Sequence, residues 1–231
     1  MRLKRPFSEG ASCDSQVVEK ARESGCKSIS YTYNEPTIFL EYVLECARLA
    51  RKKGLKNVMV SNAYINPESL KDALKVIDAA NIDLKAFNEK SYKDIGGAKL
   101  KPVLDALKLM KGNLWLELTN LIIPGRNDNM KEIEKMCKWI AEKLGKDTPM
   151  HFSMFFPMYK MMYIEPTPEK TLAKAKKIAV KYLDYVYVGN MDGESNTYCP
   201  KCSNFIIRRH HYSVEYSGRK CSCGFEIAGV F

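Results

Sequence analysis

Four of the eight cysteines in the chain lie close together near its carboxyl end. They form two short pairs, Cys199 with Cys202 in "YCPKC" and Cys221 with Cys223 in "KCSCG". Four thiolates at such spacings are typical of a tetrahedral zinc site, which stabilises a small fold without redox chemistry. The C-x-C spacing of the second pair is less usual than C-x-x-C. We predict a zinc-ribbon-like tail over residues 195–231, with iron in a rubredoxin-like site as the alternative.

The segment between the two cysteine pairs has the pattern of a β-hairpin. Ile206-Ile207 and Val214–Tyr216 are the expected strands, and the histidines His210 and His211 are expected in the exposed turn between them.

The other four cysteines are spread along the chain. Cys13 and Cys26 flank a predicted helix. Cys46 and Cys137 occur on apolar helix faces, where a thiol usually packs as a small hydrophobic group. Because only the carboxyl-terminal cysteines cluster, the pattern favours a metal site over a framework of disulfides.

A second set of polar residues follows the apolar segments of the chain one after another. Its members are Asn34, Glu35, Ser61, Asn62, Asp83, Lys85, Asn120, Gly125, Asp128, His151 and Ser153. Carboxylates, an ammonium group, amides and an imidazole at one place would suit a small zwitterionic or polyhydroxylated ligand. Each residue type also has a purely structural interpretation, which must be weighed beside the functional one.

Glu35 is the hardest of these residues to explain structurally, because a lone carboxylate before Pro36 is expected to be a poor helix cap. Asp83 and Lys85 are two apart on a strand and therefore share a face, which is either the sheet interior or a solvated exterior. We favour the interior, because helices cover the exterior of such sheets. His151 is either a ligand or a satisfied core histidine, and Asp128 could cap the following helix.

Strands and helices alternate along the chain. The predicted strands cover 28–33, 56–62, 81–87, 114–123, 150–156 and 185–190. The predicted helices cover 15–25, 37–54, 66–80, 101–112, 129–145 and 168–183. Alternation of this kind builds parallel βαβ units, in either a doubly wound sheet or a barrel.

Two features favour the barrel. No G-x-G-x-x-G turn follows the first strand, which weakens a dinucleotide-binding interpretation. The polar residues instead end successive strands, where barrels place their binding sites.

Composition excludes several classes of protein. No apolar run reaches the roughly 18 residues of a membrane span, and "MRLKRPFSEG" lacks the apolar region of a signal peptide. We therefore expect a cytoplasmic protein. The net charge of +10 would suit nucleic acid. However, the lysines follow helix faces without interleaved aromatic residues, so a nucleic-acid-binding zinc ribbon remains a minor alternative.

Several segments together resemble the radical S-adenosylmethionine (radical SAM) enzymes. These are "YTYNEPT", "VMVSNAYINP", "ANIDLKAF", "LTNLIIPGRND", "HFSMFFPMYKM" and "YVYVGN", followed by the cysteine tail. The order and spacing are most similar to the branch of the pyruvate formate-lyase activating enzyme, and within it to members that accompany AMMECR1-like and Memo-like proteins. The resemblance implies a partial (β/α)6 barrel that holds SAM across its mouth.

The resemblance also implies residues that would bind SAM. Asn34 and Glu35 match a segment that contacts the methionine amino group. Ser61 and Asn62 match a position that reaches the carboxylate or the ribose. Glu35 could also receive the SAM ammonium group directly.

Further along the chain, Asp83 matches a residue that binds the ribose, and Lys85 matches one that pairs with the carboxylate. Ile123 lies in the stretch "IIPG", which matches the segment beside the adenine. His151 matches a SAM-contacting histidine, although an alternative alignment places Phe156 there.

One element of the family is missing from the sequence. Radical SAM enzymes hold a 4Fe-4S cluster with three thiolates from a C-x-x-x-C-x-x-C loop, and no such motif occurs in the 231 residues. The strand at 28–33 corresponds to the second strand of the family. We therefore expect an N-terminally incomplete member, with a residual segment and helix at 1–27, a partial barrel at 28–194 and the tail at 195–231.

The expected function is that of a radical SAM enzyme related to glycyl-radical-enzyme activases, inactive in this form because the cluster loop is absent. A full-length form would need an electron donor and would act on a protein glycine or a small molecule. The alternative is a non-catalytic SAM-binding remnant, or a scaffold that binds a partner beside its zinc ribbon.

Overall fold

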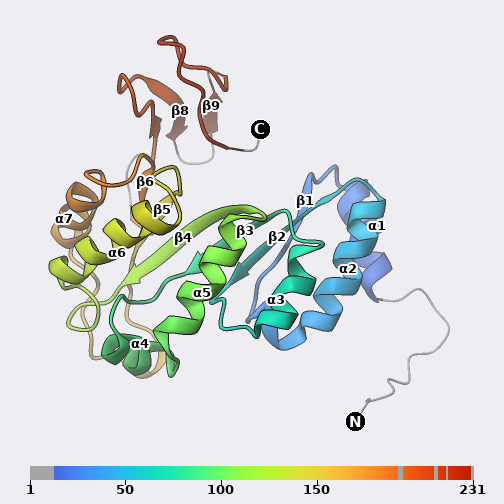
Figure 1. Cartoon of the computed structure of the whole chain (residues 1–231), viewed down its shortest axis with the longest axis horizontal. Helices are drawn as coiled ribbons and strands as arrows, with labels where there is room; N and C mark the ends of the chain where they lie inside the picture. Colours follow the sequence, from blue (N-terminus) through green and yellow to red (C-terminus); the bar gives the residue numbers. More distant parts are fainter. Residues whose placement is uncertain (1–12, 192–194, 211–212, 217, 230–231) are drawn as a thin grey trace.

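The structure, a computed structural model, describes residues 13–191, 195–210, 213–216 and 218–229 (Figure 1). Within these residues, six parallel strands form one sheet in the order β1-β2-β3-β4-β5-β6. The strands are β1 (Ser28–Tyr31), β2 (Lys56–Ser61), β3 (Ala79–Asp83), β4 (Trp115–Ile122), β5 (Met150–Met154) and β6 (Val186–Gly189).

Helical segments join each of these strands to the next. The α-helices are α1 (Cys13–Glu23), α2 (Leu40–Lys52), α3 (Pro67–Leu74), α4 (Glu89–Gly96), α5 (Leu100–Lys111), α6 (Met130–Lys143) and α7 (Glu169–Ala179). Short 3-10 helices occur at η1 (Pro36–Phe39) and η2 (Tyr159–Met161).

The strand order decides between the two predicted architectures. A doubly wound sheet reverses its order and places helices on both faces, whereas here the strands follow one another in chain order. Successive right-handed crossovers then put the helices on one face, as Figure 1 shows for α2, α3, α5 and α6. The predicted α/β fold of partial-barrel type is confirmed.

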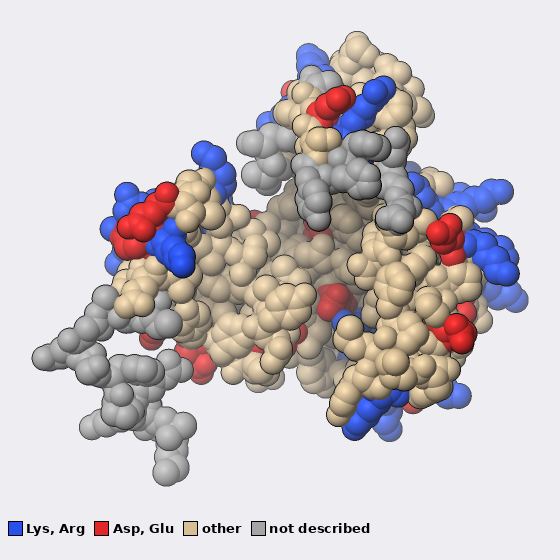
Figure 2. All heavy atoms as spheres, turned by 180° about the vertical axis from the view of Figure 1, so that it is seen from behind, with Lys and Arg blue, Asp and Glu red and all other residues tan. Residues whose placement is uncertain are grey.

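Burial alternates along the strands accordingly. On β4, Leu116 and Leu118 are at most 1% exposed and pack against helices. Glu117 and Thr119, which alternate with them, point to the opposite face and are only partly buried. Within the described residues, no helix layer covers this second face, here called the open face. Figure 2 views that side of the molecule as a hollow lined mostly by uncharged residues, with Lys and Arg gathered on the surrounding helices.

The core lies between the sheet and the helices. On α6, the apolar residues predicted to share one face are buried: Ile133, Met136, Cys137 and Ile140. Burial of each such side chain stabilises the fold by roughly 1.5–3 kcal/mol. The amphipathic pattern was therefore sufficient to predict this helix.

Several boundaries differ from the prediction; for example, β3 ends at Asp83 instead of residue 87. β1 ends at Tyr31 instead of residue 33, and the next helix begins as the 3-10 turn η1. α3 ends at Leu74, and Ala79 and Ala80, predicted to be helical, lie in β3 because they pair with both β2 and β4.

One helix, α4, was not predicted. Asn88 caps it by accepting a hydrogen bond from the N–H of Ser91 (2.7 Å). Gly97, at φ +63°, ends it in the left-handed conformation that glycine adopts readily. Because Tyr92 is its only buried residue, the helix has no repeating apolar stripe that the sequence could reveal.

The tail forms a separate antiparallel sheet of β7 (Thr197–Tyr198), β8 (Phe205–His210) and β9 (Ser213–Tyr216). The pairing of β8 with β9 confirms the predicted hairpin. His210, predicted to lie in the turn, is instead the last residue of β8 and pairs with Ser213. Its side chain and all of His211 lie outside the described residues. Tyr185, just before β6, anchors the tail: it packs in one cluster with Ile206 and Ile227, and its hydroxyl accepts a hydrogen bond from the N–H of Ala228 (3.3 Å).

No helix within the described part of the chain is long and apolar enough to span a membrane, in agreement with the sequence.

Candidate functional site

Glu35, Asn62, Asp83 and Lys85 lie at or just beyond the carboxyl ends of their strands, as predicted, whereas His151 is the second residue of β5 and lies near its amino end. In the strand register, Asp83 pairs with Thr119, Thr119 with His151, and His151 with Tyr187. These residues are partly exposed and alternate with fully buried neighbours, so their side chains share the open face. The structure therefore places Asp83 and His151 in one row, two strands apart.

Glu35 lies in the turn between β1 and η1 and is half-buried. Its Oε1 accepts hydrogen bonds from the N–H of Thr37 (3.2 Å) and the hydroxyl of Ser61 (2.6 Å). Its Oε2 accepts one from the N–H of Asn62 (2.9 Å). Glu35 is thus the N-cap of η1, which corrects the expectation that it would be a poor cap. Its extended backbone (φ −151°, ψ 113°) turns the carboxylate back over the first turn.

Asp83 and Lys85 form an ion pair at the end of β3, with 2.7 Å between Lys85 Nζ and Asp83 Oδ2. Leu84 between them is fully buried, which confirms that the two charged residues share a face. Their side chains are 36% and 32% exposed, so both charges remain accessible to a ligand. Tyr92 lies near this pair; burial raises the pKa of its hydroxyl, and the charge of Asp83 adds to the increase.

Asn34 and Asn62 are the two amide residues predicted at the ends of the first two strands. Asn62 is half-buried, and its Oδ1 accepts a hydrogen bond from the N–H of Tyr64 (2.8 Å). Asn34 is exposed in the turn after β1.

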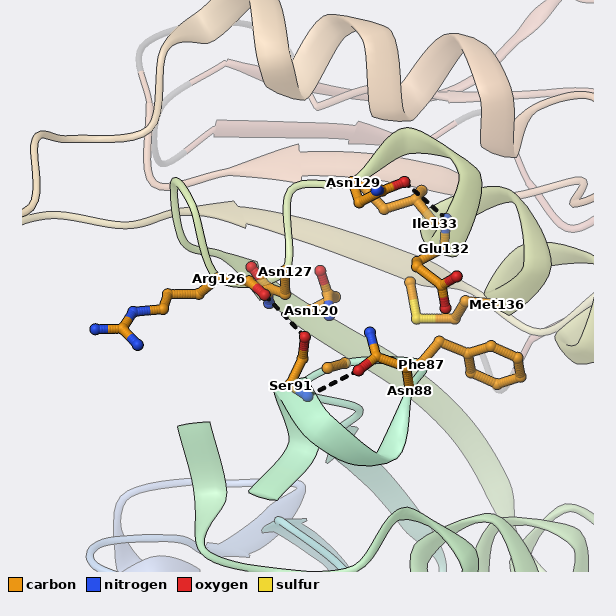
Figure 3. A pocket seen from close by; sticks show the side chains of 11 residues that line it. Phe87, Asn88, Ser91, Asn120, Arg126, Asn127, Asn129, Glu132, Ile133 and Met136 are labelled. Carbon is orange, nitrogen blue, oxygen red and sulfur yellow. Dashed lines mark hydrogen bonds between the residues drawn. The ribbon is translucent and has the colours of Figure 1, made fainter. Parts of the chain in front are cut away.

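Two buried asparagines fix the end of β3 from the helix-covered side (Figure 3). Asn120 Nδ2 donates to the carbonyls of Leu84 (2.6 Å) and Lys85 (3.1 Å). Asn127 Nδ2 also donates to the carbonyl of Lys85 (2.6 Å), and its Oδ1 accepts from the N–H of Ile123 (2.6 Å). Both amides line a cavity of ≈ 30 Å³ beneath the loop that follows β4. Asn120, expected at the mouth, is therefore a structural residue.

Sequence reasoning missed Asn127 altogether. It lies in a loop of turn-forming residues, where no periodic pattern marks a buried amide. The only available signal was a polar side chain four residues after the apolar "LII" at 121–123.

The loop after β4 brings Ile123 to the rim of the mouth. Ile123 is 4% exposed and forms a small cluster with Phe155 and Ile164. Gly125, at φ +70°, makes the turn, and its N–H donates to Asp128 Oδ1 (3.0 Å).

Asn129, not Asp128, caps α6. Its Oδ1 accepts hydrogen bonds from the N–H groups of Lys131 (2.9 Å) and Glu132 (3.4 Å). The prediction of Asp128 as the cap is wrong, because its carboxylate is turned toward Gly125. At α3, Asn66 does occupy the cap position, but its side chain makes no capping hydrogen bond.

His151 contacts Glu117, a residue that the sequence did not suggest. His151 Nε2 lies 2.7 Å from Glu117 Oε2, and Trp115 Nε1 donates to Glu117 Oε1 (2.9 Å). The imidazole also stacks on Tyr187, with 5.0 Å between ring centroids. Burial alone would raise the pKa of Glu117, but the hydrogen bonds from His151 and Trp115 outweigh it and hold that pKa below its usual value.

The four tail cysteines converge as predicted. Their sulfur atoms all lie within 4.8 Å of one another. Cys199 and Cys223 are 3.7 Å apart at sulfur, and Cys202 and Cys221 are 3.5 Å apart. Zinc–thiolate bonds of about 2.3 Å in a tetrahedron separate the sulfurs by about 3.8 Å. The geometry fits one tetrahedral metal ion, and zinc as its identity stays a prediction.

No comparable group of thiolates occurs elsewhere in the described residues. Cys46 and Cys137 are fully buried, and burial raises the pKa of Cys137 to about 12. Cys26 is exposed, and the side chain of Cys13 lies outside the described part. Within that part, the tail cysteines are the only group of three or more potential ligands close enough to hold a metal. The described mouth does not fit an iron–sulfur cluster.

The same mouth does fit the chemistry of SAM. An accessible carboxylate at Asp83 and an accessible ammonium group at Lys85 match ribose hydroxyls and a carboxylate, respectively. Ile123, predicted to lie beside the adenine, is 4% exposed and packs against Phe155 and Ile164, so its side chain offers little surface to a purine ring.

Comparison with known families agrees with the resemblance. The model of the radical SAM superfamily matches residues 15–140. An uncharacterized protein of Methanocaldococcus jannaschii is 41% identical over 222 residues, which are 92% of this chain and 66% of that protein. A second protein of that organism, provisionally named a glycyl-radical enzyme activating enzyme, is 30% identical over 177 residues, 69% of each chain. The chain spans about two thirds of the length of these relatives.

Among solved structures, a domain of pyruvate-formate lyase-activating enzyme from Bacteroides vulgatus superimposes with a TM-score of 0.60. The match covers 71% of this chain and 99% of that domain, at 14% sequence identity. At this identity the match establishes the common fold and no more.

Proposed function

This chain belongs to the radical SAM superfamily and is related to the glycyl-radical enzyme activating enzymes, and from that premise we propose that it binds SAM at the carboxyl ends of β1 to β4. The observation that best supports this site is the accessible Asp83–Lys85 ion pair on the open face. A surface ion pair contributes little to stability, so its two charges are available for a ligand at low cost.

Each residue of the proposed site has a distinct role. Asp83 accepts hydrogen bonds from the ribose hydroxyls, and Lys85 pairs with the carboxylate of the methionine moiety. Asn34 and Asn62 contribute amide groups that can donate or accept. Asn120 and Asn127 hold the backbone of Lys85 and so position it.

Glu35 acts mainly by positioning. A carboxylate has about four lone-pair positions, and three are occupied by Thr37, Ser61 and Asn62. The remaining position, on Oε2, is the one that could accept the ammonium group of SAM. Ser61, 3% exposed, supports Glu35 and is too buried to offer a large contact surface.

Ile123 and His151 complete the proposed set. Ile123, 4% exposed, would support the loop beside the adenine more than contact the ring itself. The sequence prediction that His151 contacts SAM stays open; its contacts with Glu117 and Tyr187 favour a different role, considered below.

A 4Fe-4S cluster, where bound, supplies the electron that cleaves SAM to a 5′-deoxyadenosyl radical. Because the 231 residues contain no C-x-x-x-C-x-x-C motif, we propose that they do not carry out this cleavage by themselves. Anaerobic reconstitution with iron and sulfide tests this proposal. A four-iron spectrum together with dithionite-dependent release of 5′-deoxyadenosine would overturn it.

The relatives suggest what a complete protein would act on. A relative named as an activating enzyme points to a glycyl-radical protein as substrate, and we propose this class first. Partners of the AMMECR1-like and Memo-like types, and an electron donor, are part of the same proposal. Coprecipitation from a native extract, with the tail deleted in a parallel sample, would show which partners bind and where.

SAM binding is tested by isothermal titration calorimetry of the full chain. We expect Asp83→Asn and Lys85→Gln each to weaken SAM binding by about tenfold, as the loss of a charge-assisted hydrogen bond predicts. The control is Asp72→Asn, which removes one partner of an exposed ion pair with Lys75 on the outer helices. No heat of binding with the unaltered chain, or an equal loss in the control, would contradict the proposal.

A non-catalytic scaffold remains the second candidate. Two observations on the described residues favour it. The four-cysteine group of the tail is complete, and no group of thiolates lies at the mouth. SAM binding without cleavage after reconstitution is the result this candidate predicts.

A further inference from the structure

A second cavity lies on the open face, between the sheet and the tail. Its volume is ≈ 390 Å³, within the range of about 300–1,000 Å³ typical of small-molecule sites. The sheet contributes Trp115, Glu117, His151 and Tyr187 to its lining, and the tail contributes Ile207 and Arg209. Because both the sheet and the tail line the cavity, the tail shapes a binding site in addition to holding a metal ion.

Arg209 gives the cavity a positive group. Its Nη1 donates to the carbonyl of Ser195 (2.8 Å) and to Thr197 Oγ1 (2.9 Å), which fixes the guanidinium, and the group lies over the Tyr187 ring at 5.5 Å. Arg209 forms no ion pair within the described residues, although its charge reaches Glu117 across the cavity and helps to lower the pKa of that carboxyl group. A fixed, half-buried guanidinium without a carboxylate partner is suited to an oxyanion.

The one carboxylate in the lining is already engaged. Glu117 accepts hydrogen bonds from Trp115 at Oε1 and contacts His151 at Oε2, and these contacts hold it ionised. Its charge is compensated by the imidazole and, at longer range, by the Arg209 guanidinium. The Nδ1 atom of His151 has no hydrogen-bond partner in the part of the chain that the structure describes, and it is available to one.

The walls of the cavity are aromatic. Trp115, Tyr185 and Tyr187 line it, and the His151 ring stacks on Tyr187 at an interplanar angle of 24°. Tyr185 is 4% exposed, and the Tyr187 ring already contacts His151 and the Arg209 guanidinium, so a flat ligand ring would pack against ring edges and against Trp115.

We propose that this cavity binds a small planar molecule that carries one oxyanion, a carboxylate or a phosphate. Arg209 holds the oxyanion, His151 forms a hydrogen bond with a polar group of the ring, and the aromatic walls pack against its faces. The tail closes the site from the side opposite the sheet.

The position of the cavity separates it from the proposed SAM site. His151 lies in the same row as Asp83, two strands away, or about 10 Å at a strand spacing of about 4.8 Å. However, the sheet residues of the lining belong to the amino-terminal parts of β4 to β6, since Trp115 begins β4 and Pro149 and Tyr185 directly precede β5 and β6. The ligand of this cavity is therefore a molecule other than SAM, bound away from the carboxyl ends of β1 to β4.

The test uses Trp115 as a reporter in the full chain as purified, with the metal that its tail retains. Benzoate and phenyl phosphate are the two oxyanion probes, and benzamide is the neutral probe of the same shape. We expect saturable quenching of tryptophan fluorescence by at least one anion, with benzamide weaker by about tenfold or more. The two anions distinguish a carboxylate ligand from a phosphate ligand.

Single substitutions test whether the anion binds at Arg209. Arg209→Gln should weaken the preferred anion by about tenfold, and Arg209→Lys should weaken it less. Arg208→Gln is the matched control, since Arg208 is exposed and stacks on Phe205. Metal content and a thermal melt confirm that each variant keeps its tail.

Equal quenching by benzamide, no quenching by either anion, or an equal effect of Arg208→Gln would overturn the proposal. Calorimetry with SAM on the same samples distinguishes the proposed anion-binding cavity from the proposed SAM site. Loss of the anion signal with SAM binding intact rejects this cavity alone, and loss of SAM binding with the anion signal intact rejects only the proposed cofactor site.

Discussion

At the scale of single residues, Glu35 shows how a carboxylate can have a structural task and still lie in a functional site. It connects the turn after β1 to the end of β2 through Thr37, Ser61 and Asn62. The same hydrogen bonds fix the Asn62 backbone at the mouth. A functional residue of this kind acts by holding its neighbours in place, and its substitution should affect stability and ligand binding together.

We predict that Glu35→Ala lowers the free energy of unfolding by about 2 kcal/mol, because it removes charge-assisted hydrogen bonds and leaves partly buried donors unpaired. Glu35→Gln should cost less, since one amide oxygen can still accept. Urea denaturation followed by circular dichroism measures both. The control is Glu142→Ala on the exposed side of the chain, expected within about 0.5 kcal/mol of the unaltered protein; a similar loss in this control would argue against the role assigned to Glu35.

At the scale of elements, the ends of helices carry much of the geometry of the site. α6 begins directly after the loop that holds Ile123 and Asn127, and its first turn is capped by Asn129. The cap satisfies N–H groups that would otherwise be unpaired at the helix start. The position of the loop after β4 therefore depends on the cap as well as on Asn127.

Replacement of Asn129 by alanine should destabilise the protein by about 1 kcal/mol, the usual effect of the loss of an N-cap side chain. Asn129→Ser, which keeps a side-chain oxygen at the same place, should retain most of the stability. Thermal or urea unfolding of the two variants provides the comparison. Equal stability of Asn129→Ala and Asn129→Ser would mean that the hydrogen bonds to Lys131 and Glu132 contribute nothing.

At the scale of the whole molecule, one sheet face is covered by helices and the other is left for ligands. The tail packs beside β6 and borders the open face, where it forms the cavity at Arg209 together with the sheet. We propose that the chain divides as the sequence suggested, into 1–27, 28–194 and 195–231. The separate sheet and cluster of the tail support the last boundary.

The tail should depend on its metal, since its described core is only a small cluster around Tyr185, Cys199, Ile206, Cys221 and Ile227. We expect about one zinc ion per chain, and Cys202→Ser should release it and expose the amides of β8 and β9 to hydrogen exchange. Elemental analysis and exchange mass spectrometry make the measurement. Cys26→Ser, at an exposed cysteine outside the group, is the control.

The large sheet should persist in Cys202→Ser, because its core is formed by other residues. Full metal content in this variant, or collapse of both sheets together, would contradict the independence of the tail.

The sequence by itself determined the type and order of the main elements. Helices with an apolar stripe, such as α6, and buried strands such as β4 follow from periodicity, because one face of each must leave water. The four tail cysteines were also evident, since metal ligands of a small site lie close together in sequence. The prediction that Asp83 and Lys85 share a face followed from the two-residue period of a strand.

Only the tertiary structure decided which side chains meet. The contacts of Glu35 with Ser61, and of His151 with Glu117, join residues 26 and 34 positions apart. Such pairs depend on strand register and on which way each loop turns, and neither is encoded in a local pattern. The same holds for Asn127 and for the cavity at Arg209, which exists because the tail lies against β6. Local periodicity fixes the elements, while the chemistry of the site arises from their packing.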